Sequence, residues 1–278
     1  MLGTQIADGV EVFSARTPTL PPATHTNSYA LGAREVLLVE PATPYDDERR
    51  RWLEWARGLI GRGRRPVALF VTHHHADHVG GTEFLARELG LPVWAHDLTA
   101  QRLPDVVVSR RLADGDCIDL AGPEPQRWKV LHTPGHAPGH VCLLEQRLGA
   151  VVVGDMVASV GTILIEPGDG DMRVYLDQLR RLAGLHAQVA LPAHGDPITE
   201  PTAHFEHYVR HRLKREAKVL DALAAGAADL EQLLAKVYDD TPKAVWPIAR
   251  LSLRAHLDKL LAEGRVLSHD AGYSLNEQ

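Results

Sequence analysis

The chain has 278 residues, of which 45% are hydrophobic and 24% charged, and its formal net charge is -6 at pH 7. This composition is that of a folded globular protein, and it excludes a disordered chain, a collagen-like repeat and a disulfide-rich scaffold. The negative net charge gives no general attraction to nucleic acid or to an anionic membrane, although it does not exclude a local basic face.

The N-terminal two thirds of the sequence alternate short β-rich runs with amphipathic helical stretches, which predicts an α/β domain. One helix is predicted to begin at Thr43-Pro44, where a capping residue and a proline precede apolar positions at helical spacing. A second helix is predicted to begin at Asp171 and to end at Gly184. Four short apolar runs are predicted to be buried strands, at residues 67–72, 128–133, 150–154 and 188–193.

Every one of these four runs is followed by residues that can ligate a metal. The first is followed by a histidine-rich stretch, and the others by single candidates: in chain order the residues are His73, His75, Asp77, His78, His136, Asp155 and His194. Any one of them alone would more often be structural. Their joint occurrence after strands indicates a metal site.

From about Pro201 the pattern changes. Residues 202–223 are predicted to form a long, basic, histidine-rich helix. Two further helices and a hairpin are predicted around residues 230–238, 253–261 and 266–275, with the hairpin turn at Asp270-Ala271-Gly272. Helix, helix and hairpin together predict a winged-helix module. We therefore expect a catalytic domain over residues 1–212 and a winged-helix-like domain over residues 213–278.

The run His73-His74-His75-Ala76-Asp77-His78 offers two half-sites for metal. In an extended chain, residues two apart face the same side, so His73 and His75 can reach one ion. Asp77 and His78 then turn toward a neighbouring position. Imidazole and carboxylate ligands suit zinc, and also iron or manganese, while no nearby cysteine supports a thiolate site.

Residues after the other strands would complete both half-sites. His136 would complete a three-histidine site, His194 would complete the site begun by Asp77 and His78, and Asp155 could bridge both ions. Two metals about 3.5 to 4 Å apart hold a bridging water whose pKa falls toward 7, and we expect that hydroxide to be the nucleophile. The ions would also stabilise the developing oxyanion, so no Ser or Cys nucleophile is needed. Asp77 is expected to be catalytic as well as a ligand.

Other histidines are assigned differently. For His74, His96 and His132 a structural role is expected, because none has the placement that the chemistry needs. The role of His140 stays open: it could orient a ligand, line the substrate pocket or support the metal site from behind. His140 and Arg212 are our candidates for contact with the substrate.

The segment THHHADHVGG, residues 72–81, resembles the HxHxDH signature of the metallo-β-lactamase superfamily. TPGHAPGH, VVVGD and LPAHG resemble the later ligand motifs of that family in the correct order. The resemblance implies an αββα sandwich and a hydrolase with two metal ions, for which zinc is the first candidate. It assigns His73, His75 and His136 to one metal and Asp77, His78 and His194 to the other, with Asp155 between them.

Within that family, TNSYALG, YVRHRLKRE and the late segment LRAHLDKLLAEGRV resemble the lactamase-B-like endoribonuclease branch, in which a winged helix follows the lactamase domain. This resemblance implies single-stranded RNA or a related ester as substrate. One departure is Glu40, which stands where relatives often have Asp, so support of the site from this position is in doubt. Cations on the linking helix are candidates for an RNA groove, although a solvated helical face explains them equally well: Arg210, Arg212, Lys214 and Arg215.

The predicted winged-helix domain carries nine Lys and Arg against ten Asp and Glu, a charge of -1. A nucleic-acid reader normally has a basic footprint, so we expect no binding of duplex DNA and a packing or substrate-cleft role instead.

The metal site predicts the reaction mechanism, but it does not predict which ester-type bond is cleaved. A thioesterase resembling hydroxyacylglutathione hydrolase is the main alternative, because TPGHAPGH also suits that family, although its glutathione-binding C-terminal helices are not evident. A persulfide dioxygenase with one iron bound by two His and an Asp is a weaker rival. A metal-responsive binding module is the non-enzyme hypothesis, and it predicts that Asp155→Ala leaves function intact.

Two further features concern the cell compartment. Cys117 and Cys142 have no CxxC spacing, which fits packed thiols in a reducing compartment. The N-terminal segment lacks a signal-peptide pattern, and no run approaches 18 apolar residues. We therefore expect a cytoplasmic protein without a membrane span.

Overall fold

The structure is a computed structural model that describes residues 2–226, 228–270 and 272–276. The chain forms two compact units, each built from separate segments. The first comprises residues up to 133, 138–162 and 186–201, and the second comprises residues 134–137, 163–185 and 202 onward. The domain boundary predicted after residue 212 falls inside one continuous helix of the second unit, α6 (Pro201–Ala224).

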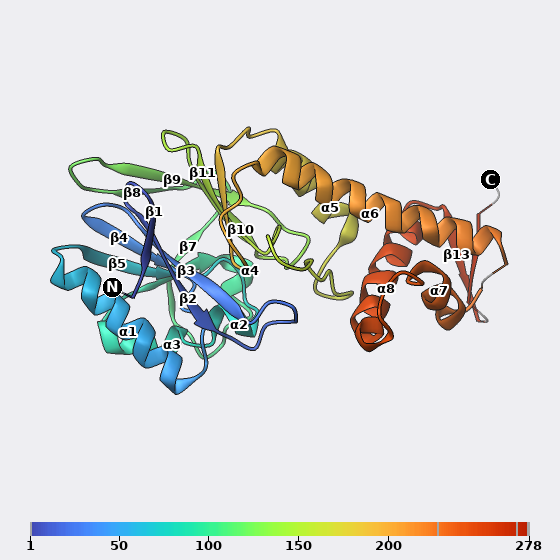
Figure 1. Ribbon diagram of the computed structural model, residues 1–278, viewed down its shortest axis with the longest axis horizontal. Helices are drawn as coiled ribbons and strands as arrows, with labels where there is room; N and C mark the ends of the chain where they lie inside the picture. The colour runs from blue at the N-terminus through green and yellow to red at the C-terminus, as the bar shows by residue number, and fades with distance from the viewer. Residues whose placement is uncertain (1, 227, 271, 277–278) are drawn as a thin grey trace. The chain divides into compact units, whose positions relative to one another are not determined.

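The first unit contains two β-sheets (Figure 1). The seven strands of the first sheet lie in chain order: β1 (Thr4–Ala7), β2 (Val10–Arg16), β3 (His25–Leu31), β4 (Glu35–Val39), β5 (Arg65–Phe70), β6 (Val93–His96) and β7 (Val108–Leu112). The first four strands pair antiparallel, and β4 to β7 pair parallel.

The second sheet has five strands in the order β12, β11, β10, β9, β8. Their bounds are β8 (Cys117–Leu120), β9 (Gln126–His132), β10 (Val141–Glu145), β11 (Ala150–Gly154) and β12 (Val189–Pro192). Only β11 and β12 pair parallel. These bounds confirm the four predicted strands to within a few residues, with β11 matching its predicted range.

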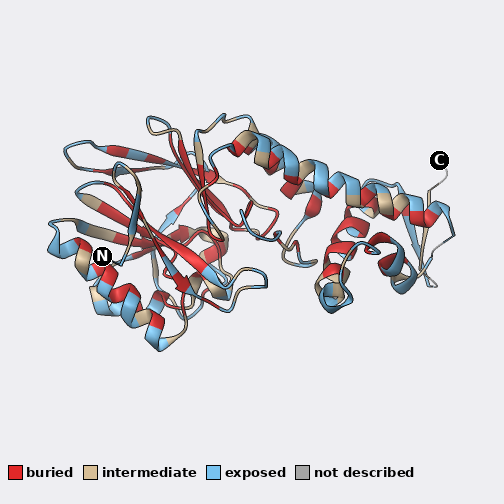
Figure 2. Ribbon diagram, viewed as in Figure 1, coloured by how far each residue is buried: buried red, intermediate tan, exposed pale blue. Residues whose placement is uncertain are grey.

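A hydrophobic core fills the space between the two sheets, as the buried red strands in Figure 2 indicate. Tyr29 and Phe70 come from the first sheet, and Trp128, Val141 and Leu191 come from the second. All five are almost fully buried. A fully buried side chain of this size contributes about 1.5–3 kcal/mol, so this layer fixes how the strand ends of the two sheets meet.

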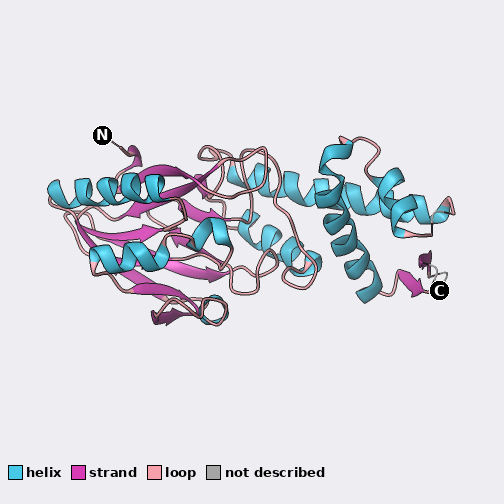
Figure 3. Ribbon diagram, turned by 90° about the horizontal axis from the view of Figure 1, so that it is seen from below, coloured by secondary structure: helices cyan, strands magenta, loops and turns pink. Residues whose placement is uncertain are grey.

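Helices α1 (Asp46–Gly61) and α3 (Thr82–Leu89) pack on the other face of the first sheet, where helices lie along the strands in Figure 3. Trp52, Trp55 and Leu59 form the buried stripe of α1. The helix begins later than predicted: Tyr45 is its N-cap residue, and Thr43 Oγ1 instead accepts a hydrogen bond from the Tyr45 backbone N–H at 3.2 Å.

The parallel strand pairs explain where the polar side chains gather. In both sheets the carboxyl ends of parallel neighbours lie at the same edge, which is where ligands bind in α/β proteins. Glu40 follows β4, and His73 lies just beyond β5. Asp155 follows β11, and His194 lies just beyond β12. A backbone hydrogen bond from Ala193 N to Gly154 O, 3.1 Å long, holds the last two strand ends together.

The second unit contains α5 (Met172–Ala183), α6, α7 (Leu230–Val237), a 3-10 turn η1 (Lys243–Val245), α8 (Trp246–Ala262) and the hairpin β13 (Val266–His269) and β14 (Gly272–Leu275). Asp171 caps α5 by accepting a hydrogen bond from Val174 N, as the sequence predicted. Leu233, Leu253 and Leu257 lie in the core of the helices and hairpin. The predicted turn residue Ala271 lies outside the described residues. No described helix is long and apolar enough to cross a membrane.

Candidate metal centre

The histidine-rich stretch leaves the sheet at the end of β5 and turns into a short helix, α2 (Ala76–Val79). Nε2 of His73 and Nδ1 of His75 lie 3.1 Å apart, so these two rings converge as the extended spacing predicts. His73 is fully buried, and its Nδ1 lies 3.0 Å from the Thr72 hydroxyl. The contact with Thr72 engages the nitrogen of His73 that faces away from His75.

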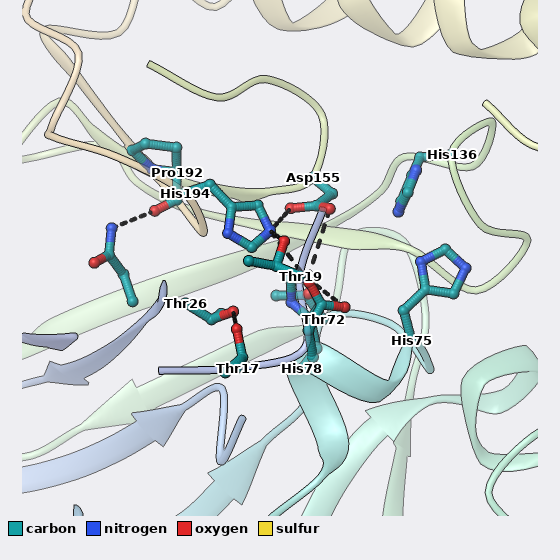
Figure 4. A network of polar contacts seen from close by, with 12 residues as sticks. Thr17, Thr19, Thr26, Thr72, His75, His78, His136, Asp155, Pro192 and His194 are labelled. Atoms are coloured by element: carbon teal, nitrogen blue, oxygen red, sulfur yellow. Dashed lines mark hydrogen bonds and ion pairs between the residues drawn. The ribbon is translucent and has the colours of Figure 1, made fainter. Parts of the chain in front are cut away.

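Two aspartates and two histidines interlock beside this pair. Figure 4 shows three of them, His78, Asp155 and His194. Asp77 directs one carboxylate oxygen toward His78 Nε2, at 3.7 Å, and the other toward His194 Nε2, at 3.5 Å. Asp155 does the same, at 3.6 Å and 3.3 Å. Four side chains from three separate parts of the chain therefore aim their ligand atoms at one small space, and Asp77, His78 and His194 lie within 4.8 Å of one another.

Glu40 supports this group from behind, which corrects the doubt raised by its replacement of the usual Asp. Its Oε2 lies 3.4 Å from His78 Nδ1, and its Oε1 accepts a hydrogen bond from the Thr72 hydroxyl. The carboxylate therefore reaches His78 in spite of the exchange. Glu40 adopts a φ of 60°, which is uncommon for a residue with a side chain and costs on the order of 1–3 kcal/mol. Such strain is typical of functional sites.

His194 is held by hydrogen bonds that involve the first residues of β3. Its Nδ1 donates to the carbonyl oxygen of His25 at 2.9 Å, so Nε2 is the nitrogen that faces the carboxylates of Asp77 and Asp155. The side chain of Asn27 donates to the carbonyl oxygens of Pro192, at 3.0 Å, and Gly195, at 2.7 Å. The amide of Asn27 thus clamps the loop that carries His194. Asn27 lies within the TNSYALG segment, but no sequence pattern predicted this contact.

Both ring nitrogens of His140 contact the ends of neighbouring strands, and its predicted contact with substrate stays a prediction. The ring is fully buried, its Nδ1 lies 2.8 Å from the Thr133 hydroxyl, and its Nε2 accepts a hydrogen bond from the backbone N–H of Asp155 at 3.1 Å. His140 therefore orients Asp155. Gly154 makes the approach possible: it has a φ of 47°, and a Cβ there would lie 2.6 Å from His140 Nε2.

The charges of this site shift one another's pKa values. Burial alone would raise the pKa of Asp155, but the neighbouring His194 and His78 outweigh it and hold that pKa well below its usual range. Burial alone would lower the pKa values of His78 and His194. The carboxylates of Asp77 and Asp155 nevertheless raise the pKa of His78, and the carboxylate of Asp155 raises that of His194. The carboxylates of this group thus favour a positive charge on both rings.

The donor set fits a metal ion. His78 is fully buried, yet neither of its ring nitrogens makes a hydrogen bond to a described residue. Its Nε2 instead faces oxygens of Asp77 and Asp155 at 3.7 and 3.6 Å, a spacing that leaves room for a cation among the three groups. All donors are imidazole nitrogens and carboxylate oxygens, a set that suits zinc, iron or manganese. The thiol of Cys142 contacts the Thr133 hydroxyl instead, at 3.3 Å.

Two predicted site residues belong to the second unit. His136 lies in the segment between β9 and β10, where its Nδ1 donates to the Leu164 carbonyl oxygen at 2.9 Å and leaves Nε2 as the lone-pair nitrogen. Arg212 is buried in α6, where its guanidinium donates to the Ile163 carbonyl oxygen and lies 5.6 Å from the centroid of the Tyr175 ring. Their predicted roles as metal ligand and substrate contact stay predictions.

Of the three histidines that were expected to be structural, His96 and His132 contact each other, whereas the role of His74 stays a prediction. His96 caps the helix α4 (Asp97–Ala100) by accepting a hydrogen bond from Leu98 N at 3.2 Å. The rings of His96 and His132 stack with centroids 4.1 Å apart. His74 lines an open cavity of about 490 Å³ beside α2 and α3, together with Arg49 and Arg87.

Comparison with known proteins decides the family. Residues 21–194 match the family described as the metallo-beta-lactamase superfamily, which is more than half of the chain. The protein belongs to the metallo-beta-lactamase superfamily. Residues 230–273 match the beta-lactamase associated winged helix domain, which agrees with the helices and hairpin of the second unit. The protein is a metal-dependent hydrolase of this superfamily.

Relatives and solved structures agree with this membership. The chain is 27% identical to the Beta-lactamase-like protein 2 homolog of Drosophila melanogaster, over 87% of this chain and 84% of that protein. It is 28% identical to an Atrochrysone carboxyl ACP thioesterase of Aspergillus chevalieri, over 79% of this chain and 70% of that protein.

Two crystal structures share the fold of this metallo-beta-lactamase superfamily member. A metallo-beta-lactamase family protein from Thermus thermophilus has a TM-score of 0.80 at 23% identity, and the match spans 98% of this chain and 100% of that protein. A beta-lactamase domain protein from Burkholderia ambifaria has a TM-score of 0.85 at 20% identity and covers 99% and 93%.

Proposed function

We propose that this protein is a dinuclear-metal hydrolase that cleaves thioesters and related carboxylic esters. Two zinc ions, for which iron or manganese are substitutes, would be bound by His73, His75 and His136 and by Asp77, His78 and His194, with Asp155 between them. The observation that carries the proposal is the interlocked set of carboxylates, in which Asp77 and Asp155 each aim one oxygen at His78 and one at His194.

His136 lies in the short segment between β9 and β10, which belongs to the second unit. Its Nδ1 is engaged by the Leu164 carbonyl oxygen, which directs Nε2 to any metal.

The chain supplies the surroundings in which such chemistry works. A pair of divalent ions lowers the pKa of water toward 7 and polarises the bond to be cleaved. Asp155 stays ionised at neutral pH, because its pKa is held far below its usual range by His194 and His78. Glu40, His140 and Asn27 fix the positions of His78, Asp155 and the His194 loop. Preorganised ligands of this kind need no rearrangement during the reaction.

Two observations favour a thioester over RNA as the substrate. The relatives include proteins named Atrochrysone carboxyl ACP thioesterase. Of the four cations predicted to line an RNA groove, Arg212 is buried, and Arg215 binds the Val237 carbonyl oxygen and Asp240. Arg210 is exposed but pairs with Glu206 at 3.3 Å. Most of the predicted basic groove is therefore already engaged within the second unit.

A substrate panel tests the proposal. The zinc-loaded protein is assayed with an acyl-pantetheine thioester, a glutathione thioester, a lactone, nitrocefin and single-stranded RNA. We expect thioester hydrolysis by the wild type. Asp155→Asn should lose at least about a thousandfold in rate, because the bound ions lower the activation barrier by several kcal/mol. The control is Asp119→Asn, which changes an exposed carboxylate on β8 that pairs with Arg127. Cleavage of RNA alone, or full activity of Asp155→Asn, contradicts the proposal.

A further inference from the structure

The loop between β2 and β3, residues 17–24, carries a hydroxyl to the metal centre. Oγ1 of Thr19 lies 3.5 Å from Nε2 of His194, the contact drawn beside Asp155 in Figure 4. We infer that Thr19 is a substrate-contacting residue, whose hydroxyl donates a hydrogen bond to the substrate oxygen that gains negative charge. This inference rests on the proposed hydrolase function and adds a catalytic residue to it.

The position of Thr19 places its hydroxyl on the reacting side of His194. The same nitrogen, Nε2, lies 3.3 Å from an oxygen of Asp155 and 3.5 Å from an oxygen of Asp77. These are the atoms that define the proposed metal position. The Thr19 hydroxyl therefore faces the space in which the substrate would be held, and not the supporting layer behind the ligands.

His194 does not depend on Thr19 for its orientation. Its ring is fixed through Nδ1 by the carbonyl oxygen of His25 at 2.9 Å, and its backbone carbonyl accepts a hydrogen bond from Ser159 N at 3.2 Å. The contact with Thr19 is at the outer limit of hydrogen-bond distance and adds little to these. When Nε2 binds a cation, its lone pair no longer accepts, so the hydroxyl hydrogen is available to another acceptor.

The loop is anchored firmly enough to position this hydroxyl. The hydroxyls of Thr17 and Thr26 lie 2.8 Å apart and both residues are buried, and Thr17 N donates to Thr24 O at 3.3 Å. Between these anchors Thr19 is only half-buried, so substrate has access to it. An uncharged donor aimed at developing negative charge is the arrangement of an oxyanion hole.

The test measures anion binding separately from metal binding. Inorganic phosphate, a tetrahedral oxyanion, is titrated into zinc-loaded wild type, Thr19→Val, Thr19→Ser and Thr24→Val, and zinc affinity is measured by competition with a chelator. The matched control, Thr24, is in the same loop, but its hydroxyl contacts the exposed His25 side chain at 2.8 Å.

We expect Thr19→Val to weaken phosphate binding about tenfold or more, because a hydrogen bond to a charged group is lost, while zinc affinity stays within about twofold. Thr19→Ser should restore phosphate binding, and Thr24→Val should match wild type. In turnover, Thr19→Val should lower kcat with a smaller effect on KM.

Three results would overturn the inference. These are unchanged phosphate binding by Thr19→Val, a parallel loss of zinc affinity that marks a purely structural role, or no phosphate binding by the zinc-loaded wild type. If the wild type hydrolyses nothing in the substrate panel, the proposed function fails by itself, while the phosphate titration still decides the role of Thr19.

Discussion

Oε2 of Glu40 lies 3.4 Å from Nδ1 of His78, and both side chains are almost completely shielded from solvent. A carboxylate behind a ligating imidazole fixes its ring orientation and raises its basicity, and losing such a partner typically costs about 10–100-fold in metal affinity. We therefore expect Glu40→Gln to weaken binding of the second zinc ion by that factor and to lower kcat. Competition with a chromophoric chelator measures the two zinc affinities separately.

The matched control for Glu40 is Glu48→Gln. Glu48 is also a buried glutamate, but it pairs with Arg51 at 2.9 Å on α1, away from the metal centre. The zinc affinities of the Glu48→Gln variant should equal those of wild type. Equal zinc affinities in Glu40→Gln and wild type would show that the Glu40 carboxylate does not support metal binding by His78.

Metal binding should release protons. Asp77 and Asp155 raise the pKa of His78, and Asp155 raises the pKa of His194, so in the metal-free protein both rings hold protons at pH values above about 6.5, the ordinary value for histidine. A metal ion has to displace those protons. Apparent zinc affinity should therefore fall as pH falls, by up to about tenfold per pH unit for each proton displaced.

Titration of zinc into the chelated protein in weak buffer, with a pH indicator, counts the released protons. Asp155→Asn removes one of the charges that raise both pKa values, so its proton release at pH 7 should be smaller than that of wild type. A zinc affinity that does not change between pH 6 and pH 8 would contradict the raised pKa values.

Gly154→Ala should damage the site through His140. At a φ of 47°, alanine is strained by about 1–2 kcal/mol, and its Cβ would lie 2.6 Å from His140 Nε2. The ring has to move, which breaks its hydrogen bond to Asp155 N. The control is Gly63→Ala, where φ is 80° but a Cβ meets nothing within 4 Å. Both variants should lose stability in urea, but only Gly154→Ala should lose zinc affinity.

Local sequence patterns predicted the parts of this fold that depend on neighbouring residues. The strand β11, the α5 helix with its Asp171 cap and the C-terminal hairpin follow from short-range spacing, and the structure confirms them. The convergence of His73 with His75 also followed from two-residue spacing. These features need only the geometry of a strand or a helix, which the sequence encodes directly.

Contacts between distant segments were not predictable in the same way. The reach of Glu40 to His78 depends on the parallel pairing of β4 with β5, and the clamp of Asn27 on Pro192 joins residues 165 positions apart. Thr43 looked like a helix cap, but Tyr45 occupies that position. No single-sequence pattern reports which partner a buried polar side chain will find, because tertiary packing decides it.

The last prediction concerns His256, which lies in α8 of the second unit. Its side chain is fully buried, and neither ring nitrogen makes a hydrogen bond to a described residue. Burial first, and then the charges of Arg212, Lys259, Arg215 and His211, lower its pKa well below the ordinary value. The folded unit thus keeps this imidazole neutral.

The sign of the pH dependence follows from that lowered pKa. Above about pH 6.5, His256 is neutral in both the folded and the unfolded chain, and it does not affect the pH dependence of stability. As pH falls below that value, only the unfolded chain takes up the proton, so the free energy of unfolding decreases by up to about 1.4 kcal/mol per pH unit until the folded pKa is reached. The second unit should therefore loosen in acid.

Replacing His256 with leucine removes the group that titrates, so His256→Leu should retain at pH 5 the protection that it has at pH 7.5. Hydrogen exchange of α7 and α8, corrected for the intrinsic rate, measures this directly because it reports on the second unit by itself. The control is His269→Gln, which changes an exposed histidine of the β13–β14 hairpin and should behave like wild type. If His256→Leu loses as much protection as wild type between pH 7.5 and pH 5, the acid sensitivity of this unit does not come from His256, because the variant has no imidazole at that position to take up a proton.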